Sequence, residues 1–203
     1  MTKEQFIELV KGKLTSADPN PDIEEKYHSK RIELFISLAF NDVIYQVFAR
    51  NLDEKDLYAR SYTVDVLYDE TYDQYYSTLP ALVIQLPMNT GVHKISPLQE
   101  SWSFLPINQL QEDVFSELEV NTICKDPSYY FNTNRVFYQY YDWKNQHIRQ
   151  VKMDLIISFE SYANTDIVVI PAGKESTIVD LVTQMMSQQL TADHTKNLND
   201  TQA

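Results

Sequence analysis

The sequence predicts an α+β fold with N-terminal helices, including one long helix, then an antiparallel β-sheet, and last a C-terminal amphipathic helix with a polar tail. Apolar residues recur at the helical period over 30–50 and again after Pro171. Between these segments apolar and polar residues alternate, as they do along strands. The length of 203 residues suits one domain. We expect a single domain over 1–190, made of a helical part (1–52), a mainly β part (58–170) and a closing helix (171–190), followed by a flexible tail (191–203).

Two helices are predicted in the helical part. Thr2 and Gln5 have the spacing of a capping box, ahead of a helix over about 3–14. The second helix is expected over about 23–50, which is roughly 40 Å at 1.5 Å per residue. Its apolar face is broad and consists of Ile32, Phe35, Ile36, Ala39, Phe40, Val43, Ile44, Val47 and Phe48. The polar residues that fall mostly on the other side are Glu33, Ser37, Asn41, Asp42 and Gln46. So broad a face needs more than one surface to pack on, either this chain's sheet or a neighbouring subunit.

The β part contains several strand-like segments. Tyr62, Val64, Val66 and Tyr68 alternate with polar or smaller residues, which is typical of a strand. We also expect a short buried strand over 81–86, a loop or short strand over 101–107, a hairpin of strands 129–141 and 147–159 around a turn at 142–146, and a short strand over 166–170. Residues 108–120 are ambiguous. A closing helix is expected over about 175–190 because the helical period returns there.

Composition excludes several classes of function. The formal net charge is −12, whereas a nucleic-acid binder shows a basic face, and a negative chain is also repelled by an anionic membrane surface. The single cysteine, Cys124, allows neither an intramolecular disulfide nor a cysteine-based zinc site. The three glycines, Gly12, Gly91 and Gly173, are too far apart to form a phosphate-binding loop. No apolar stretch is long enough to span a bilayer, so we expect no membrane partner.

Constellations of metal-ligating residues are incomplete. Glu25 and His28 have the Glu-x-x-His spacing of di-iron bundles, but those sites use the motif twice with two further glutamates. A solvated helix end explains this pair as well. Four carboxylates crowd one region, yet they lack the spacing and the central glycine of a calcium loop. These four residues, which we expect to be solvated or to rim an interface, are Asp65, Asp69, Glu70 and Asp73.

A nucleophilic site is equally weakly indicated. Cys124 and His147 could be paired as nucleophile and base, but any chain with one cysteine and a few histidines allows that pairing. The sequence has no Gly-x-Ser-x-Gly elbow. We therefore expect that the chain is not an enzyme and needs no metal and no cofactor.

Clustered tyrosine is the most unusual local feature. Tyr68, Tyr72, Tyr75 and Tyr76 lie in a segment without lysine or arginine between Arg60 and Lys94. Base stacking is disfavoured because single-strand binders pair aromatic residues with cations. Because tyrosine is enriched at protein interfaces, we expect Tyr72, Tyr75 and Tyr76 to lie on a projecting loop or hairpin that contacts another subunit. A tyrosine-rich loop that lies on its own sheet is an open alternative. The expected subunit interface consists of Tyr68, Tyr72, Tyr75, Tyr76, Phe40, Phe48 and Trp143.

Three segments, 30–50, 101–107 and 166–190, and the order of the elements around them give the chain a resemblance to a known family. The chain resembles the head-to-tail connector (adaptor or ring) proteins of tailed bacteriophages, most of all those of crAss-like phages. The resemblance implies a structural virion protein, assembled in the host cytoplasm. It implies a homo-oligomeric ring of about twelve copies between portal and tail. The implied partners are the portal protein and other neck or tail proteins, with DNA only as a passing, non-specific contact.

Two functions of different classes therefore follow from the sequence. The first is a structural ring protein that lines or surrounds the DNA channel of a virion. The alternative is a soluble cytoplasmic protein-binding or regulatory module without catalysis. An enzyme with an unrecognised site is a third and weaker reading.

Overall fold

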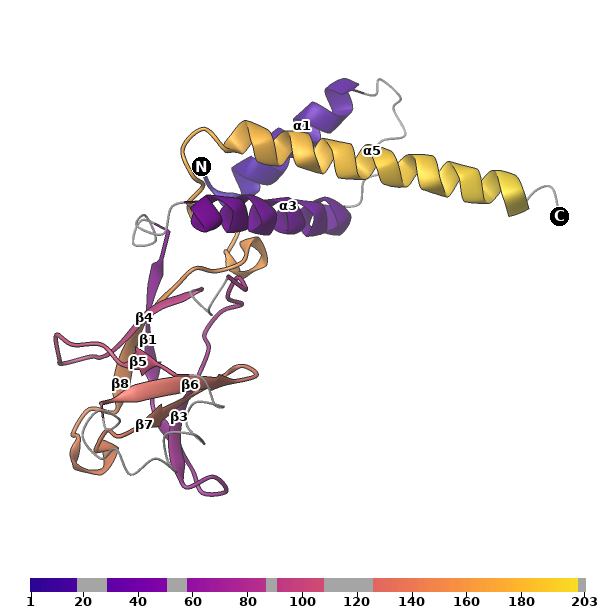
Figure 1. The fold of residues 1–203 in the computed structure, drawn as a ribbon. Coiled ribbons are helices and arrows are strands. Elements are labelled where there is room, and N and C mark those ends of the chain that lie inside the picture. The colour runs from indigo at the N-terminus through magenta and orange to yellow at the C-terminus, as the bar shows by residue number, and fades with distance from the viewer. Residues whose placement is uncertain (18–28, 51–57, 87–90, 108–125, 201–203) are drawn as a thin grey trace. The chain divides into compact units, whose positions relative to one another are not determined.

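The computed structural model describes residues 1–17, 29–50, 58–86, 91–107 and 126–200. The predicted α+β class is confirmed, since helices and mainly antiparallel sheets are both present (Figure 1). The chain divides into two compact units. The helical unit is formed by Met1–Tyr58 with Ile157–Ala203, and the β unit by Ala59–Ile156. Residues 157–170, expected in the β part, thus belong to the helical unit, whereas folding as one domain stays a prediction.

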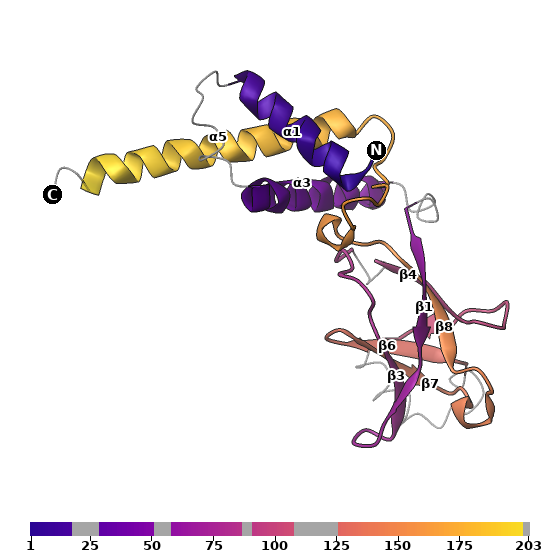
Figure 2. The same ribbon diagram turned by 180° about the vertical axis from the view of Figure 1, so that it is seen from behind.

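The described residues of the helical unit form α1 (Lys3–Ala17), α3 (Ser29–Arg50), α5 (Glu175–Asp200) and the short 3-10 helix η4 (Phe159–Ser161). The three long helices contact one another, and α1 and α5 lie on the same side of α3 in both ribbon views (Figures 1 and 2). Helix η4 contacts α3 from the other side. Helix α3 is therefore the centre of the unit, which explains why its apolar face is so broad.

The start of α1 confirms the predicted capping box. The Gln5 backbone N–H donates to Thr2 Oγ1 at 3.2 Å, and the Thr2 N–H donates to Gln5 Oε1 at 3.0 Å. The N–H groups of Lys3 and Glu4 donate to the carbonyls of Asp166 and Asn164. The first turn of α1 is thus joined to the loop that follows η4.

Helix α5 differs from the prediction at its C-terminal end. It continues past residue 190 to Asp200, and its last turns extend beyond α1 and α3 in both ribbon views (Figures 1 and 2). Residues 191–200 contain no glycine or proline, so no helix-terminating residue stops the helix where its apolar residues end. The mobility of residues 191–203 stays a prediction.

The described residues of the β unit form two sheets. The three-stranded sheet has the order β1-β8-β4 and the five-stranded sheet has the order β2-β3-β7-β6-β5. Neighbouring strands are antiparallel except β5 and β6. The bounds are β1 (Arg60–Asp65), β2 (Leu67–Asp69), β3 (Gln74–Thr78), β4 (Val92–Pro97), β5 (Leu105–Pro106), β6 (Ser128–Asn132), β7 (Arg135–Gln139) and β8 (Gln150–Leu155). A 3-10 helix, η3 (Trp143–Asn145), precedes β8.

The two sheets are joined on both sides. On one side β1 and β2 are separated only by Val66, whose N–H donates to the Arg149 carbonyl at 2.8 Å. On the other side the Phe104 N–H donates to the Ile95 carbonyl of β4 at 2.8 Å, just before β5 pairs with β6. The buried residues of the β unit include Ile95, Phe104, Val136, Trp143, Val151, Met153 and Leu155.

The predicted hairpin of 129–141 with 147–159 is wrong. Segment 129–141 folds on itself as β6 and β7, which turn at Thr133 and Asn134, and β8 pairs with β1 and β4 instead. Thr133 adopts a φ of 60°, a left-handed conformation that threonine rarely takes, and the aromatic residues on both sides conceal the turn. The 166–170 strand is also wrong, since only Ile167 forms a bridge there, with Thr2.

Segment 81–86 is not the predicted buried strand. Ile84 and Leu86 are buried, whereas Leu82 is 64% exposed. The Ile84 N–H donates to the Ile156 carbonyl, and the Ile156 N–H donates to the Gly91 carbonyl. A Cβ on Gly91 would lie 2.0 Å from the Ile84 carbonyl oxygen, so only glycine allows the two backbones to approach this closely.

Candidate functional site

The tyrosine cluster forms a β-hairpin in the β unit. Strands β2 and β3 pair in antiparallel register, with Tyr68 opposite Tyr75 and Leu67 opposite Tyr76. Tyr72 lies in the turn between the strands. The expectation that Tyr72, Tyr75 and Tyr76 lie on a loop or hairpin is therefore confirmed, with Tyr72 in the turn and Tyr75 and Tyr76 in β3.

Aromatic residues continue from this hairpin across the five-stranded sheet in two rows. Cross-strand partners share a face of a sheet, and consecutive residues take opposite faces. The first row runs over β2, β3, β7 and β6 and consists of Tyr68, Tyr75, Tyr138 and Tyr129. The second row, on the opposite face, consists of Leu67, Tyr76, Phe137 and Tyr130. Much of the tyrosine therefore serves cross-strand packing, the alternative that the sequence left open.

Trp143 packs on the first row and belongs to the core. Its ring centroid lies 5.3 Å from that of Tyr138 and 6.3 Å from that of Tyr75, and it stacks on Phe104 at 6.0 Å. Trp143 is only 1% exposed. The interface role predicted for it is corrected, because a side chain enclosed by its own sheet offers no surface to a subunit.

Phe40 and Phe48 require the same correction. Both side chains are 1% exposed, on the buried face of α3. Phe40 packs on Phe159 at 5.9 Å, and Phe48 meets Tyr58 edge-on at 5.5 Å. The apolar period of the helix is equally consistent with a core and with an interface, and the structure assigns these two residues to the core of the helical unit.

Side-chain contacts hold the turn between β2 and β3 in one shape. Arg135 of β7 donates to Asp69 Oδ2 at 3.0 Å, and the Thr71 N–H donates to Asp69 Oδ1 at 3.0 Å. The Tyr68 hydroxyl donates to the Asp73 carboxylate. Asp73 has a φ of 51°, a conformation that aspartate tolerates better than most residues.

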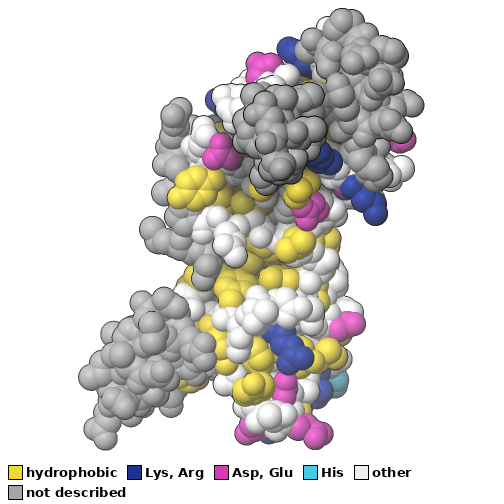
Figure 3. Space-filling model, turned by 90° about the vertical axis from the view of Figure 1, so that its right-hand side faces the viewer, with side chains coloured by type: hydrophobic (Ala, Val, Ile, Leu, Met, Phe, Trp, Pro, Cys, Tyr) yellow, Lys and Arg dark blue, Asp and Glu magenta, His cyan; other side chains and the backbone are white. Residues whose placement is uncertain are grey.

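Three apolar side chains remain exposed on this hairpin. Leu67 is 51%, Tyr68 is 42% and Tyr72 is 60% exposed, and we call these three residues the hairpin patch. Tyr75 and Tyr76 are only partly exposed. Hydrophobic (yellow) and acidic (magenta) side chains lie next to one another at the lowest end of the view in Figure 3.

The described tyrosines with shifted pKa values are all harder to ionise than usual. The hydrogen bond to Asp73 raises the pKa of Tyr68. Burial raises the pKa of Tyr129 to about 12, and burial followed by the hydrogen bond to Glu100 raises the pKa of Tyr141 to about 12. Burial also raises the pKa of Tyr138. These four hydroxyls therefore stay protonated near neutral pH and act as packing groups or hydrogen-bond donors.

A second exposed apolar surface lies on α3. Leu34 and Leu38 are each 50% exposed and Tyr45 is 46% exposed, and their spacing places them along one side of the helix. We call these three residues the α3 stripe. The burial predicted for this helix is therefore partly wrong. Ser37, expected on the polar side, is only 2% exposed, whereas Leu34 and Leu38 are exposed.

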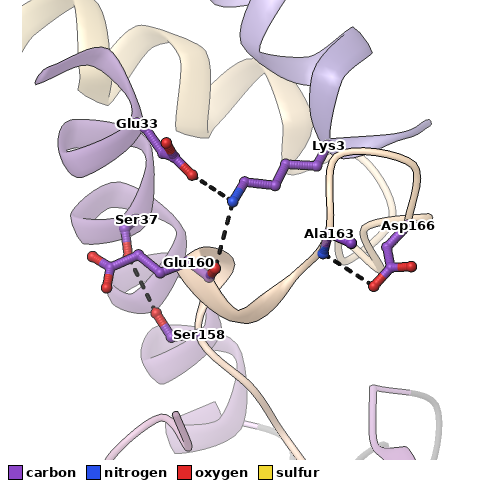
Figure 4. A network of polar contacts seen from close by, with 7 residues as sticks. All are labelled: Lys3, Glu33, Ser37, Ser158, Glu160, Ala163 and Asp166. Atoms are coloured by element: carbon purple, nitrogen blue, oxygen red, sulfur yellow. Dashed lines mark hydrogen bonds and ion pairs between the residues drawn. The ribbon is translucent and has the colours of Figure 1, made fainter. Parts of the chain in front are cut away.

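The side of α3 that carries Ser37 and Glu33 is joined by polar contacts to α1 and to the η4 region, and Ser37 is buried there (Figure 4). Its hydroxyl oxygen lies 3.1 Å from that of Ser158. Lys3, only 4% exposed, pairs its ammonium group with the Glu33 carboxylate and donates to the Glu160 carbonyl at 3.5 Å. Since both contacts hold this ammonium group, we interpret it as a structural tie between helices.

The carboxylates of the hairpin do not converge on a common centre. Asp69 pairs with Arg135, and Asp65 accepts a hydrogen bond from Gln150 Nε2 at 2.8 Å. Within the described ranges no group of three or more histidine, cysteine, aspartate or glutamate side chains is placed to hold a metal ion. Glu25, His28 and Cys124 of the predicted constellations lie outside the described residues, whereas His147 is described and exposed.

A comparison of the chain with protein-family models gives no match, and neither does a comparison with curated protein sequences. In the part of the chain that the structure describes, no helix combines the length and the apolar character that crossing a bilayer requires.

Proposed function

We propose that the chain is a structural virion protein that forms a homo-oligomeric ring between the portal and the tail of a tailed bacteriophage. In this role it lines or surrounds the DNA channel and binds its own copies, the portal protein and other neck or tail proteins. The ring contains about twelve copies, and closed rings arise when each copy uses two different surfaces.

The observation that carries the proposal is the presence of two separate exposed apolar surfaces on one chain. The α3 stripe lies on the helical unit and the hairpin patch lies on the β unit. Single exposed apolar residues are common on monomers, but residues gathered on one side of a helix or at one turn mark interaction sites. A ring protein between portal and tail needs at least two such surfaces, one against the next copy and one against a different neck or tail protein.

The chemistry of these surfaces suits subunit contacts. Tyr45 and Tyr72 offer large contact areas with few rotatable bonds. An aromatic side chain at the centre of an interface often contributes about 2 kcal/mol or more when it is truncated. The net charge of −12 supports the channel role as well, since an acidic wall does not hold a passing DNA duplex.

The experiment that tests the proposal is native mass spectrometry of the chain, alone and with the portal protein encoded in the same genome. We expect one oligomer of about twelve copies, formed alone or on the portal. Leu34→Glu with Leu38→Glu should abolish it. Leu9→Glu is the matched control, because Leu9 is 49% exposed on α1 of the same unit but lies outside the α3 stripe.

Two outcomes would contradict the proposal. A chain that stays monomeric in both samples would favour the alternative, a soluble protein-binding or regulatory module. Equal loss of the oligomer in the control variant would show that the α3 stripe has no special part in assembly.

A further inference from the structure

We propose that the hairpin patch docks on a different protein, at an apolar surface rimmed by lysine or arginine. The inference rests on the proposed function and goes further, because it names the chemistry of the partner at one of the two surfaces. Under this assignment the hairpin patch contacts a basic neighbour, and copies of this chain meet through other surfaces.

The exposed apolar side chains define the docking surface. Leu67 and Tyr68 follow one another on β2, so they point to opposite faces of the hairpin. Tyr72 extends the surface at the turn, where its ring also meets Phe137 edge-on at 5.9 Å. A partner that buries all three must therefore enclose the end of the hairpin from both sides.

The hairpin is already in one defined shape before any partner binds. Asp69 is fixed by Arg135 and by the Thr71 N–H, and the Tyr68 hydroxyl is held by Asp73. An ordered surface loses less conformational freedom on binding, which favours affinity. The shape alone does not select a partner, so the occupant is argued from charge.

Charge selects a basic partner. The hairpin and the end of β1 carry four carboxylates and no cation, namely Asp65, Asp69, Glu70 and Asp73. Two arginines from other parts of the β unit approach it. Arg135 pairs with Asp69 and lies 4.6 Å from the Tyr76 ring, and Arg149 lies 5.8 Å from the Tyr75 ring.

Four carboxylates against two arginines leave the hairpin acidic. Glu70 is exposed beside Tyr72 at the turn. Cations on a partner would complement this charge and speed the encounter. Arginine suits the site especially, because a guanidinium group can pair with Glu70 and stack on the exposed ring of Tyr72.

A second copy of this chain fits the same surface poorly. Each copy has a net charge of −12, so a second copy complements the acidic hairpin less well than a basic protein does. The α3 stripe is bordered by the exposed Asp42 between Leu38 and Tyr45 as well as by Lys30 and Arg31 one turn before Leu34, so it does not offer the uniformly basic rim that suits the hairpin patch. Nucleic acid is disfavoured for the same reason, because phosphates would meet carboxylates.

The test measures binding of the full chain to two fluorescent peptides, one alternating arginine with leucine and one alternating glutamate with leucine. We expect fluorescence anisotropy to detect binding of the arginine peptide only. Tyr72→Ala should weaken this binding by about tenfold, as truncation of an interface anchor does. Glu70→Gln with Asp73→Asn should weaken it and reduce its dependence on salt.

A matched control separates the hairpin from general attraction to an acidic protein. Glu4→Gln with Glu175→Gln removes the same charge from two exposed positions of the helical unit, and should leave the affinity nearly unchanged. The proposal would be overturned if this control weakened the affinity for the arginine peptide equally. It would also be overturned if Tyr72→Ala, with the same melting temperature as the wild type, bound the arginine peptide as tightly as the wild type. Self-association that is lost in Tyr72→Ala would overturn it as well, because the occupant would then be a second copy.

This result and the oligomer result can be told apart. Hairpin-dependent binding of the arginine peptide by a chain that never forms an oligomer would refute the ring and keep the docking surface. The reverse result is also informative. If the oligomer is lost only in Leu34→Glu with Leu38→Glu, and the arginine peptide shows no hairpin-dependent binding, the docking surface is refuted and the ring is kept.

Discussion

Replacing Tyr75 and Tyr76 together by alanine should destabilise the folded chain substantially. Tyr75 packs on Tyr68 at 5.0 Å and on Trp143 at 6.3 Å. Tyr76 packs on Phe137 at 5.8 Å and beneath the Arg135 guanidinium at 4.6 Å. The two rings lie on opposite faces of the sheet, so each substitution removes a different set of contacts.

The magnitude follows from burial. Truncation of a fully buried aromatic residue costs about 3–5 kcal/mol. Both tyrosines are partly exposed, so about half of that, roughly 2 kcal/mol each, is expected. Because the two residues share no ring partner, the effects should nearly add to about 4 kcal/mol. Such a loss lowers Tm by roughly 8–16 °C in a chain of this length.

The assay is urea unfolding followed by tryptophan fluorescence, with Tyr72→Ala as the control. Tyr72 is 60% exposed, so its truncation should change the free energy of unfolding by about 1 kcal/mol or less. A double variant as stable as the wild type would refute the packing described for β3. A Tyr72 variant as unstable as the double variant would show that the turn also belongs to the core.

Four further predictions follow from other parts of the structure. Gly91→Ala should destabilise the chain by about 1–3 kcal/mol in urea unfolding, since its Cβ would meet the Ile84 carbonyl, and unchanged stability would contradict that close approach. Lys3→Met should cost about 1–3 kcal/mol because it leaves the partly buried Glu33 carboxylate unpaired, and adding Glu33→Gln should recover part of this loss. The raised pKa of Tyr129 contributes stability that is fully present below about pH 10 and is lost as the pH rises to about 12. In an alkaline titration, ultraviolet absorbance should therefore show ionisation of Tyr129 only near pH 12. Calorimetry should give one unfolding transition, as expected for a single domain, whereas two separate transitions would show that the two units unfold independently.

Local signals in the sequence predicted the helices well. The capping box of Thr2 and Gln5 needs only neighbouring residues, and both of its hydrogen bonds are present. The helical period identified the buried residues of α3, including Phe40 and Phe48. The same period could not distinguish a core from an interface, because burial against α1 and α5 and burial against another chain require the same apolar spacing.

The sheet was less predictable because its pairing is non-local. The β6–β7 turn rests on Thr133 in a left-handed conformation, for which the sequence gives only the weak signal of the flanking asparagines. The partners of β8, which are β1 and β4, come from distant segments of the chain. Without that pairing, the sequence could not show that Tyr75 continues a row to Tyr138.

The proposed role as a ring protein of a tailed phage is tested most directly by electron cryo-microscopy of particles assembled from the genome that carries this chain. The proposal predicts a ring of about twelve copies between portal and tail, with the α3 stripe of each copy buried against the next copy. It also predicts the hairpin patch of each copy seated on a basic surface of a different neck or tail protein. Particles that lack the chain, or a ring in which Leu34, Leu38 and Tyr72 all face solvent, would contradict it.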